Sequence, residues 1–304
     1  MTRVVPLTAG QVTVRPVIAA VVVTHAAPAA TLAACIDSIR RAGGVDRIIV
    51  VDNGENATLK RDDIELIVTP NSGYGAAANE GFHRAFALGA SAIALLNDDV
   101  TVRSGWAEPL AAALEQRGVG AAQPKLLIAG SNPPRVNSLG VAIGRDGAGT
   151  DIGDGSLDVV VGSPSVIDRF TGGAVMFAPD FLRETGGFDE RFFLYYEDVD
   201  LAARGSALGW SYTLVPASVV EHERGTTTGV DSDRTRYLQE RNRLGHAFRH
   251  CDAGTQMRAI WLSVRRLRHQ PRAVHAKALC SGLACAPGAW FRRLRRANST
   301  GPLR

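Results

Sequence analysis

The chain has 304 residues, of which 45% are hydrophobic, and it contains 32 glycines. This length and composition exclude a disordered or fibrous protein, and they suit one large α/β domain with a smaller appendage. The net charge of +4 hides two unlike regions: residues 1–252 hold 23 Lys/Arg and 30 Asp/Glu, whereas residues 253–304 hold 11 Lys/Arg and no acid. The body is therefore acidic and the C-terminal region strongly basic.

The cysteines and the apolar segments bear on the cellular location. Four cysteines without CxxC spacing predict reduced thiols of a cytoplasmic protein and no zinc site; they are Cys35, Cys251, Cys280 and Cys285. Residues 1–16 lack the apolar core of a signal peptide, and residues 278–291 are too short and too broken by Gly and Pro to span a bilayer. We expect neither secretion nor a transmembrane helix.

In chain order, the first elements alternate between strand and helix. Continuous apolar runs of strand length predict buried parallel strands, and helical patterns follow the first and third of them. The predicted strands are 17–23, 47–51, 65–68 and 92–96, and the predicted helices are 32–41 and 76–88. The alternation indicates βαβ units, and hence a mostly parallel sheet flanked by helices.

The second half of the chain is less regular. Residues 118–168 are rich in Gly, Pro, Ser and Asp, which predicts irregular loops and short antiparallel strands. A helix is expected from Pro179 to the Gly186-Gly187 pair, and another over residues 198–208 with acids in its first turn. From residue 233 onward helical patterns with many arginines dominate, interrupted by prolines at 271 and 287.

Acidic residues and one histidine follow apolar runs that we interpret as strands or helices. Asn97-Asp98-Asp99 follows the fourth strand, Glu197-Asp198 follows residues 192–196, and His222 follows Val219-Val220-Glu221. Strand ends of an open α/β sheet meet at one edge, where such folds bind ligands. Mg²⁺ and Mn²⁺ prefer carboxylate and phosphate oxygens, and Mn²⁺ also accepts imidazole. A solvated acidic turn and a structural histidine are the alternatives.

Two further pairs could bind a nucleotide and a reacting hydroxyl. Thr24-His25 and Asp52-Asn53 stand at the first two strand ends, where an amide and a carboxylate can pair with a base, although Asp52-Asn53 is also a turn sequence. Glu197-Asp198 lies beside an aromatic cluster, and a carboxylate there can take the proton of an attacking hydroxyl. The alternative is an acidic first turn of a helix.

The order and flanking residues of these segments resemble the family 2 glycosyltransferases, which have the GT-A fold, over roughly residues 17–245. The matching segments are Val21–His25, Val50–Gly54, Asn71–Gly81, Leu95–Val100, Thr171–Ala174, Gly186–Phe193, Tyr196–Leu201 with Arg204, and His222 with Gly225. The ordered series is specific, whereas any one piece is not.

The resemblance implies a fold, an activity and residue roles. It implies an α/β, Rossmann-like GT-A domain at 17–245, with a nucleotide-sugar-binding half at 17–117 and an acceptor half at 118–245. This domain would lie between an N-terminal segment 1–16 and a basic helical region 246–304.

The resemblance also implies roles for single residues. The nucleotide-sugar-binding residues would be Thr24, His25, Asp52, Asn53, Asn71, Gly73, Asn79, Asn97 and Asp98. Gly172 and Gly173 would form the acceptor loop. The divalent metal, Mg²⁺ or Mn²⁺, would bind Asp99 and His222, with Asn97 where the family commonly has a first Asp. Asp198, with Glu197 beside it, would be the catalytic base.

The donor and the acceptor stay open in part. The pattern from Thr171 to Asn242 resembles the rhamnosyltransferases, which favours dTDP-rhamnose, while UDP-galactofuranose and UDP-GlcNAc remain alternatives. The family likeness implies a glycan or polyprenyl-linked acceptor in cell-envelope polysaccharide synthesis. An arginine of Arg241-Asn242-Arg243 could approach the diphosphate, or that segment could be a solvated helix face.

The basic region predicts contact with an anionic membrane. Over residues 257–268 the apolar Ile260, Trp261, Val264 and Leu267 share one helical side and four arginines lie largely elsewhere, and residues 290–296 repeat this chemistry. Such a helix can rest on anionic lipid, which would make the protein peripheral on the inner face of the plasma membrane. Alternatively these helices only pack on the body.

Two other functions compete with the transferase. Residues 73–78 fit the G-x-G-x-x-A pattern of NAD(P)-binding oxidoreductases, with Asp98 20 residues beyond Ala78. Against that, the loop follows the third strand and not the first, and the later acids and His222 would have no task. A nucleic-acid-binding protein is disfavoured by the acidic body and the absence of a recognition module in the sequence. A transferase fold without activity is a third alternative.

Overall fold

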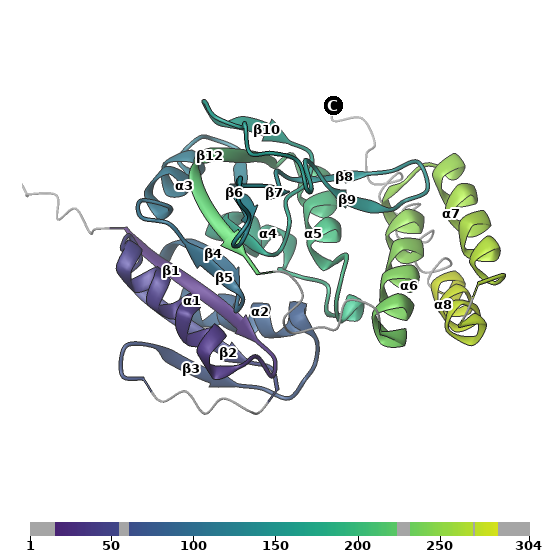
Figure 1. The fold of residues 1–304 in the computed structure, drawn as a ribbon, viewed down its shortest axis with the longest axis horizontal. Helices are drawn as coiled ribbons and strands as arrows, with labels where there is room; N and C mark the ends of the chain where they lie inside the picture. Colours follow the sequence, from purple (N-terminus) through teal and green to yellow (C-terminus); the bar gives the residue numbers. More distant parts are fainter. Residues whose placement is uncertain (1–15, 55–60, 224–231, 270, 285–304) are drawn as a thin grey trace, which may run out of the picture.

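A ten-stranded sheet forms the centre of the molecule in the computed structural model, which describes residues 16–54, 61–223, 232–269 and 271–284 (Figure 1). The strands are β1 Val17–Thr24, β2 Arg47–Asp52, β3 Glu65–Val68, β4 Ala90–Asn97, β5 Val100–Val102, β6 Val119–Ile128, β7 Val136–Ser138, β8 Val141–Ile143, β9 Gly149–Asp151, β10 Ser165–Ile167, β11 Ala174–Phe177 and β12 Ser211–His222. The helices are α1 Ala29–Ala42, α2 Tyr74–Ala87, α3 Ala107–Leu114, α4 Pro179–Thr185, the 3-10 turn η1 Glu190–Phe192, α5 Glu197–Ser206, α6 Asp233–His250, α7 Ala253–Arg266 and α8 Arg272–Ala284.

The N-terminal half of the sheet is parallel, as the apolar runs predict. In the strand order β3-β2-β1-β4 all three pairings are parallel, and Thr24 pairs with Asp52 while Val23 pairs with Asn97. The carboxyl ends of β1, β2 and β4 therefore end side by side. Because the chain runs from β1 outward to β3 and then returns to β4 on the other side of β1, a topological switch point opens between β1 and β4, where such sheets bind ligands.

The C-terminal half of the sheet is mixed. Strand β11 is antiparallel to β4 and β6, β6 is parallel to β12, and β10 closes the edge antiparallel to β12. The strand β6 corrects the prediction of irregular structure from residue 118, because it is ten residues long and almost wholly buried. Its Gly120 resembles a strand breaker, but a Cβ there would lie 2.6 Å from the Phe181 ring, so packing against α4 requires glycine. Short strands β7 to β10 do occur, as predicted.

Helices cover both faces of the sheet. One buried cluster packs α1 and α3 on the sheet, and a second packs α2, α4 and α5 on the opposite face. The predicted helices after Pro179 and over 198–208 are confirmed as α4 and α5. Residues 193–196, in contrast, are neither strand nor helix, and three of them have positive φ: Phe193, Tyr195 and Tyr196.

The C-terminal helices stand to one side of the sheet (Figure 1) and share a small core around Leu244 and Phe248. The predicted boundary at residue 245 falls inside α6, which runs from Asp233 to His250 without a break. In the described ranges no helix combines the length and the hydropathy needed to cross a bilayer. The N-terminal segment up to residue 15, Cys285, Pro287 and the second basic stretch at 290–296 lie outside the described residues.

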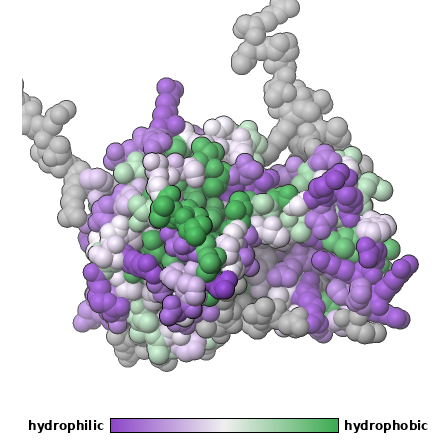
Figure 2. All heavy atoms as spheres, turned by 45° about the horizontal axis from the view of Figure 1, so that its top comes forward, coloured by the Kyte–Doolittle hydropathy of each residue, from purple (hydrophilic) through white to green (hydrophobic). Residues whose placement is uncertain are grey.

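Figure 2 shows the contrast between two surfaces of the molecule: hydrophobic side chains gather on the face that carries β10 and β12, and mostly hydrophilic ones cover the side of α6 to α8. The most exposed large hydrophobic side chains near the edge strand β10 are Val161 at 88%, Val166 at 81% and Val159 at 78%.

Candidate active site

A cavity of about 820 Å³ opens at the carboxyl ends of β1, β2 and β4. This volume is in the range of small-molecule sites in proteins. Its lining includes twelve of the fifteen site residues predicted from the sequence: His25, Asn53, Asn71, Gly73, Asn97, Asp98, Asp99, Gly172, Gly173, Glu197, Asp198 and His222. Segments up to 197 residues apart in the chain thus meet in one hollow, as the family likeness implied.

Three predicted residues do not line the cavity. Thr24 and Asp52 are buried just beneath it, where the Thr24 carbonyl accepts the Asn53 N–H and the Asp52 carboxylate accepts the Gly54 N–H. Asn79 is buried on α2, and its amide exchanges hydrogen bonds with the Phe188 backbone at 2.9 and 3.0 Å. The structure therefore gives Asn79 a place in the support of residues 188–190, and its predicted contact with a donor has no support here.

The end of the cavity next to β1 and β2 is lined by polar side chains, among them His25, Asn53 and Asn71. The His25 ring lies 3.0 Å from the Asn53 carbonyl and 3.4 Å from the Asn71 amide. The Asn53 side chain also accepts the Ser72 N–H, which ties the end of β2 to the segment before α2. These side chains present amide and imidazole groups at the strand ends, which is the chemistry expected for pairing with a base.

The glycines before α2 have a packing role that the dinucleotide alternative did not foresee. Gly73 has φ +101°, and a Cβ there would lie 2.4 Å from the Phe193 carbonyl, while a Cβ at Gly75 would lie 3.0 Å from the Phe188 side chain. The Tyr74 N–H donates to the Phe193 carbonyl at 2.7 Å. The G-x-G pattern thus serves contact with another part of the protein, and the alternative loses its main support.

Asp99 and His222 face one another at the centre of the cavity. Asp99 Oδ1 lies 3.0 Å from His222 Nε2, and His222 Nδ1 lies 2.7 Å from the Asn137 amide oxygen. The contact with Asn137 holds the ring so that Nε2 faces the Asp99 carboxylate. An imidazole oriented in this way is how proteins prepare a histidine ligand.

The residues present therefore fit a divalent metal. No cluster of three or more acidic, His or Cys ligands occurs in the part of the chain that the structure describes. Two protein ligands suffice when a diphosphate supplies the remaining oxygens. Asn137 was missed by the sequence reasoning, because it lies 85 residues from His222 and no local pattern marks it.

Asp198 stands at the first turn of α5 on the other side of the metal pair. Its carboxylate accepts the N–H of Gly172 at 2.8 Å and that of Val199 at 2.7 Å. Burial raises the pKa of Asp198 above its usual value, and the two N–H donors oppose that rise. The neighbouring Glu197 is buried, and its pKa is raised by burial and by the charge of Asp198. A carboxylate with a raised pKa is a stronger base and suits proton abstraction from a hydroxyl.

Tyr74 joins the two sides of the site and was not singled out from the sequence. Its hydroxyl lies 2.9 Å from both the Asn97 side-chain oxygen and the Gly172 carbonyl. Burial, followed by the charges of Glu197 and Asp198, raises the pKa of Tyr74 well above its usual value. The hydroxyl therefore stays protonated and holds the end of β4 to the loop that binds Asp198.

The strained segment before Asp198 is held from α6. The Asn242 side-chain amide donates to the carbonyls of Phe192, Leu194 and Tyr195 at 2.9, 2.8 and 2.8 Å, and Asn242 is 3% exposed. Arg241 donates to the Phe192 carbonyl at 2.6 Å. Positive φ costs free energy for residues with side chains, so the segment needs such external bonds. Arg241 thus supports backbone and does not line the cavity.

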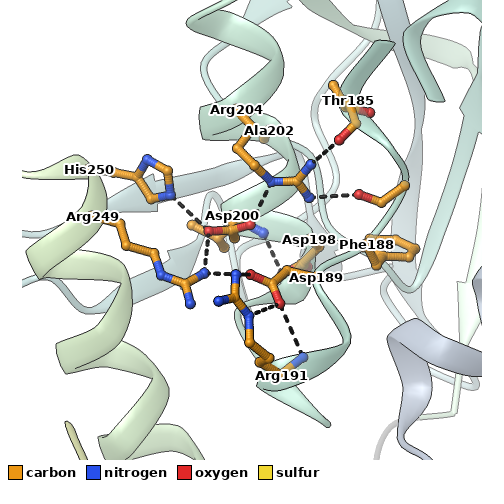
Figure 3. Close-up of polar contacts among 12 residues, drawn as sticks. Thr185, Phe188, Asp189, Arg191, Asp198, Asp200, Ala202, Arg204, Arg249 and His250 are labelled. Carbon is orange, nitrogen blue, oxygen red and sulfur yellow. Dashed lines mark hydrogen bonds and ion pairs between the residues drawn. The ribbon is translucent and has the colours of Figure 1, made fainter. Parts of the chain in front are cut away.

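A buried ion network behind Asp198 anchors α5 to α6 (Figure 3). Asp200 is fully buried and receives Arg204 at 2.7 Å, Arg249 at 3.2 Å and His250 at 2.8 Å. Burial alone would raise the pKa of Asp200, but the His250 hydrogen bond and the arginine charges hold it well below its usual value. Arg249 also reaches Asp189 at 2.8 Å. The network fixes the first turn of α5, which carries Glu197 and Asp198.

The comparisons with known proteins agree with this geometry. The Glycosyl transferase family 2 profile matches residues 19–170, which is half of the chain. The chain belongs to glycosyl transferase family 2. It is a glycosyltransferase with a GT-A fold.

Two relatives from Mycobacterium tuberculosis cover less of the chain. A pre-mycofactocin glycosyltransferase is 30% identical over 191 residues, which are 59% of this chain and 38% of the relative. An N-acetylglucosaminyl-diphospho-decaprenol L-rhamnosyltransferase is 48% identical over 48 residues, 16% of each chain. The matched part thus spans about two fifths of the first relative and a sixth of the second.

A solved structure supports the fold. GalNAc-T7 with UDP, GalNAc and Mn²⁺ superposes with a TM-score of 0.67 over 95% of this chain and 58% of that chain, at 14% identity. At this identity the likeness speaks for the fold alone. The roles of the individual site residues therefore stay predictions, and they are taken up as proposals below.

Proposed function

We propose that the protein is an inverting, metal-dependent glycosyltransferase that moves a sugar from a nucleotide diphosphate donor to a hydroxyl of a glycan or polyprenyl-linked acceptor. One observation carries this proposal: His25 and Asn53, the facing pair Asp99 and His222, and Asp198 with its raised pKa all line one cavity. The arrangement suits a donor that extends from His25 and Asn53 past Asp99 toward Asp198.

In this mechanism Asp198 takes the proton of the acceptor hydroxyl as that oxygen attacks the anomeric carbon from the face opposite the nucleotide. The bond from the anomeric carbon to the diphosphate oxygen breaks, the electron pair leaves with the diphosphate, and the anomeric configuration inverts. Asp99 and His222 would hold a Mg²⁺ or Mn²⁺ ion, whose charge stabilises the leaving diphosphate when bound. Gly172 orients Asp198 through its N–H, and Glu197 adds no second negative charge beside that carboxylate when it is protonated.

For the donor we favour dTDP-rhamnose, and UDP-galactofuranose and UDP-GlcNAc are the alternatives. Support comes from the sequence pattern between Thr171 and Asn242 and from the 48-residue similarity to a relative named as an L-rhamnosyltransferase. That name also supports a polyprenyl diphosphate-linked acceptor, and for this acceptor we favour a role in cell-envelope polysaccharide synthesis.

The test is a transfer assay with a panel of nucleotide diphosphate sugars and Mn²⁺, in which released nucleotide is measured and the product's anomeric configuration is read by NMR. We expect release with dTDP-rhamnose above that with the UDP-sugars, and an anomeric configuration opposite to that of the donor. A retained configuration, or equal release without any divalent ion, would contradict the mechanism.

We also propose that α7 rests on an anionic membrane, on the inner face of the plasma membrane. The exposed apolar side chains of α7 form a stripe of Met257 at 65%, Trp261 at 59% and Val264 at 49%. Ile260 and Leu267, predicted on this side, are partly covered instead. Arg265 stacks on Trp261 at 4.6 Å, and residues 253–284 contain no acid. Aromatic and cationic side chains on one surface helix suit the headgroup layer.

Co-sedimentation with vesicles of phosphatidylcholine and phosphatidylglycerol tests this contact. Trp261→Ser should lower the fraction of protein bound to the vesicles several-fold. Leu208→Ser removes an exposed hydrophobic side chain (55%) away from α7 and should leave that fraction unchanged. If Trp261→Ser binds the vesicles as well as Leu208→Ser does, the membrane proposal is wrong and the transferase proposal is unaffected.

A further inference from the structure

The end of the cavity beyond Asp198 is lined by cations. Arg234 and Arg243 come from α6 and Arg266 from α7, and Arg243 donates to the Asp146 carbonyl in the turn between β8 and β9 at 2.7 Å. Figure 1 shows this hairpin reaching from the sheet toward α6 and α7. The base-reading end of the same cavity has no such charges among its described lining residues, so the two ends suit different ligands.

Arg243 is the unusual member, because it is a buried cation without a counter-ion. It is 2% exposed, and its guanidinium donates only to neutral oxygens: the carbonyls of Asp146 at 2.7 Å and Ala259 at 3.2 Å, and the Ser263 hydroxyl at 2.6 Å. Its Nε has no hydrogen-bond partner, and among the described residues no carboxylate oxygen lies within 4.0 Å of it. Isolated buried charge is costly, and an incoming anion lowers that cost.

Arg266 supplies a second, more accessible charge beside Arg243. Its only described ion pair is a long one, 3.6 Å to Glu240, whose same oxygen is already bonded to His275 at 2.7 Å. Arg266 is 38% exposed, so it can turn toward a ligand. Burial and the nearby charge of Arg266 lower the pKa of Arg243, and the charges of Glu240 and Asp146 oppose that change.

The position of these arginines relative to Asp198, the proposed catalytic base, decides which substrate they would meet. Tyr196, which precedes Glu197, accepts the Gly149 N–H of the hairpin through its hydroxyl at 3.0 Å, and Arg243 donates to the Asp146 carbonyl of the same hairpin at 2.7 Å. Asp151 of β9 and Asp198 line the same cavity. The hairpin thus links Arg243 to the turn that carries Asp198.

We propose that Arg243 and Arg266 form an anion subsite that binds the phosphate or diphosphate of the acceptor while its hydroxyl lies at Asp198. This inference rests on the proposed transferase function and names its acceptor class: a sugar that carries a phosphoester, held either on a lipid or free. The phosphate takes no part in the bond changes and serves only to position the acceptor. Arginine suits this task, since its fork of donors matches phosphate oxygens.

Binding of farnesyl diphosphate and of inorganic pyrophosphate to the full chain, measured by calorimetry in EDTA, tests the subsite. Arg266→Ala should weaken both probes about tenfold, and Arg266→Lys should restore part of the affinity. Arg268→Ala, the same charge change at an exposed position in the turn after α7, should leave both affinities unchanged. Farnesyl diphosphate binding at least tenfold tighter than pyrophosphate would assign the anion to a lipid; equal affinities would assign it to a free phosphate.

Two outcomes would overturn the subsite. One is wild-type affinity in Arg266→Ala with an unchanged thermal unfolding midpoint. The other is loss of binding in Asp99→Ala with no loss in Arg266→Ala, because the probes would then occupy the donor end. Release of nucleotide from a donor sugar with Mn²⁺, without acceptor, is measured in parallel. This release reports on the transferase proposal alone, so a failure of that proposal can be distinguished from a failure of the anion subsite.

Discussion

The two halves of the active site are built in different ways. In the donor half, residues such as Asn53 and Asn97 take their places because each ends its own buried strand, and parallel pairing brings those ends together. In the acceptor half, Asp198 follows a segment with three residues at positive φ and is positioned by contacts from Gly172 and α6. The donor half is fixed by local sequence and the sheet, and the acceptor half by long-range hydrogen bonds.

The largest effect should come from the acceptor half, at Asp198. Asp198→Asn keeps the shape of the side chain and removes the base, so transfer should fall about 10²- to 10⁴-fold. The measurement is initial rate of nucleotide release with acceptor, with the unfolding midpoint as a check on folding. Asp180→Asn, in the exposed first turn of α4, is the matched control and should keep full rate. Transfer within threefold of wild type would show that another group is the base.

The proposed metal pair, with Asp99 from the donor half and His222 from the acceptor half, should give the next largest effect. His222→Ala or Asp99→Asn should raise the Mn²⁺ concentration for half-maximal rate about 10- to 100-fold, since each removes one of two protein ligands. Asn137→Ala should act in the same direction but less, because it only orients His222. Asp62→Asn, an exposed acid away from the cavity, should not change the metal requirement. An unchanged Mn²⁺ curve in His222→Ala would remove that residue from the metal site.

A third variant tests whether the strained segment depends on α6. Asn242→Ala removes the side-chain donor of the Leu194 and Tyr195 carbonyls and one of the donors to Phe192, and it should cost about 1–3 kcal/mol of stability. If Asn242 positions the catalytic turn, kcat should fall about tenfold while KM for the donor stays near wild type, because Asn242 touches nothing in the donor half. Gln116→Ala, which removes an exposed amide elsewhere, should change neither value. Equal changes in kcat and in donor KM would mean a general loss of fold.

The same contrast explains what the sequence could predict. The parallel strands, their flanking helices and the polar residues at their ends were predictable, because buried strands appear as apolar runs and parallel pairing aligns their ends. The strand β6 was missed, since Gly120 and Pro124 resemble breakers when the Phe181 ring that requires the glycine is unseen. Asn137, Tyr74 and the role of Asn242 were missed for a related reason: each acts on residues 47 to 98 positions away, and no local pattern records such a contact.

The smallest expected effect is on the stability of the folded protein and comes from Glu197. This buried side chain of the acceptor half is unfavourable when it carries a charge. Glu197 is buried, its Oε2 has no hydrogen-bond partner among the described residues, and its folded-state pKa is raised by burial and by Asp198. The folded protein then binds this proton more tightly than the unfolded chain. Stability from the neutral carboxyl is thus fully present below the unfolded pKa and is lost as pH rises through the folded pKa.

Glu197→Gln keeps a neutral group of similar shape at every pH. Its unfolding midpoint, measured by scanning fluorimetry without metal from pH 5 to pH 9, should match wild type in acid and exceed it by about 2–4 °C in base. Glu80→Gln, at an exposed position on α2, should give a constant difference across the series. If the wild-type protein instead becomes more stable than Glu197→Gln as pH rises, the Glu197 carboxylate is charged and paired with a cation. The acceptor half would then satisfy its buried polar groups as well as the donor half does.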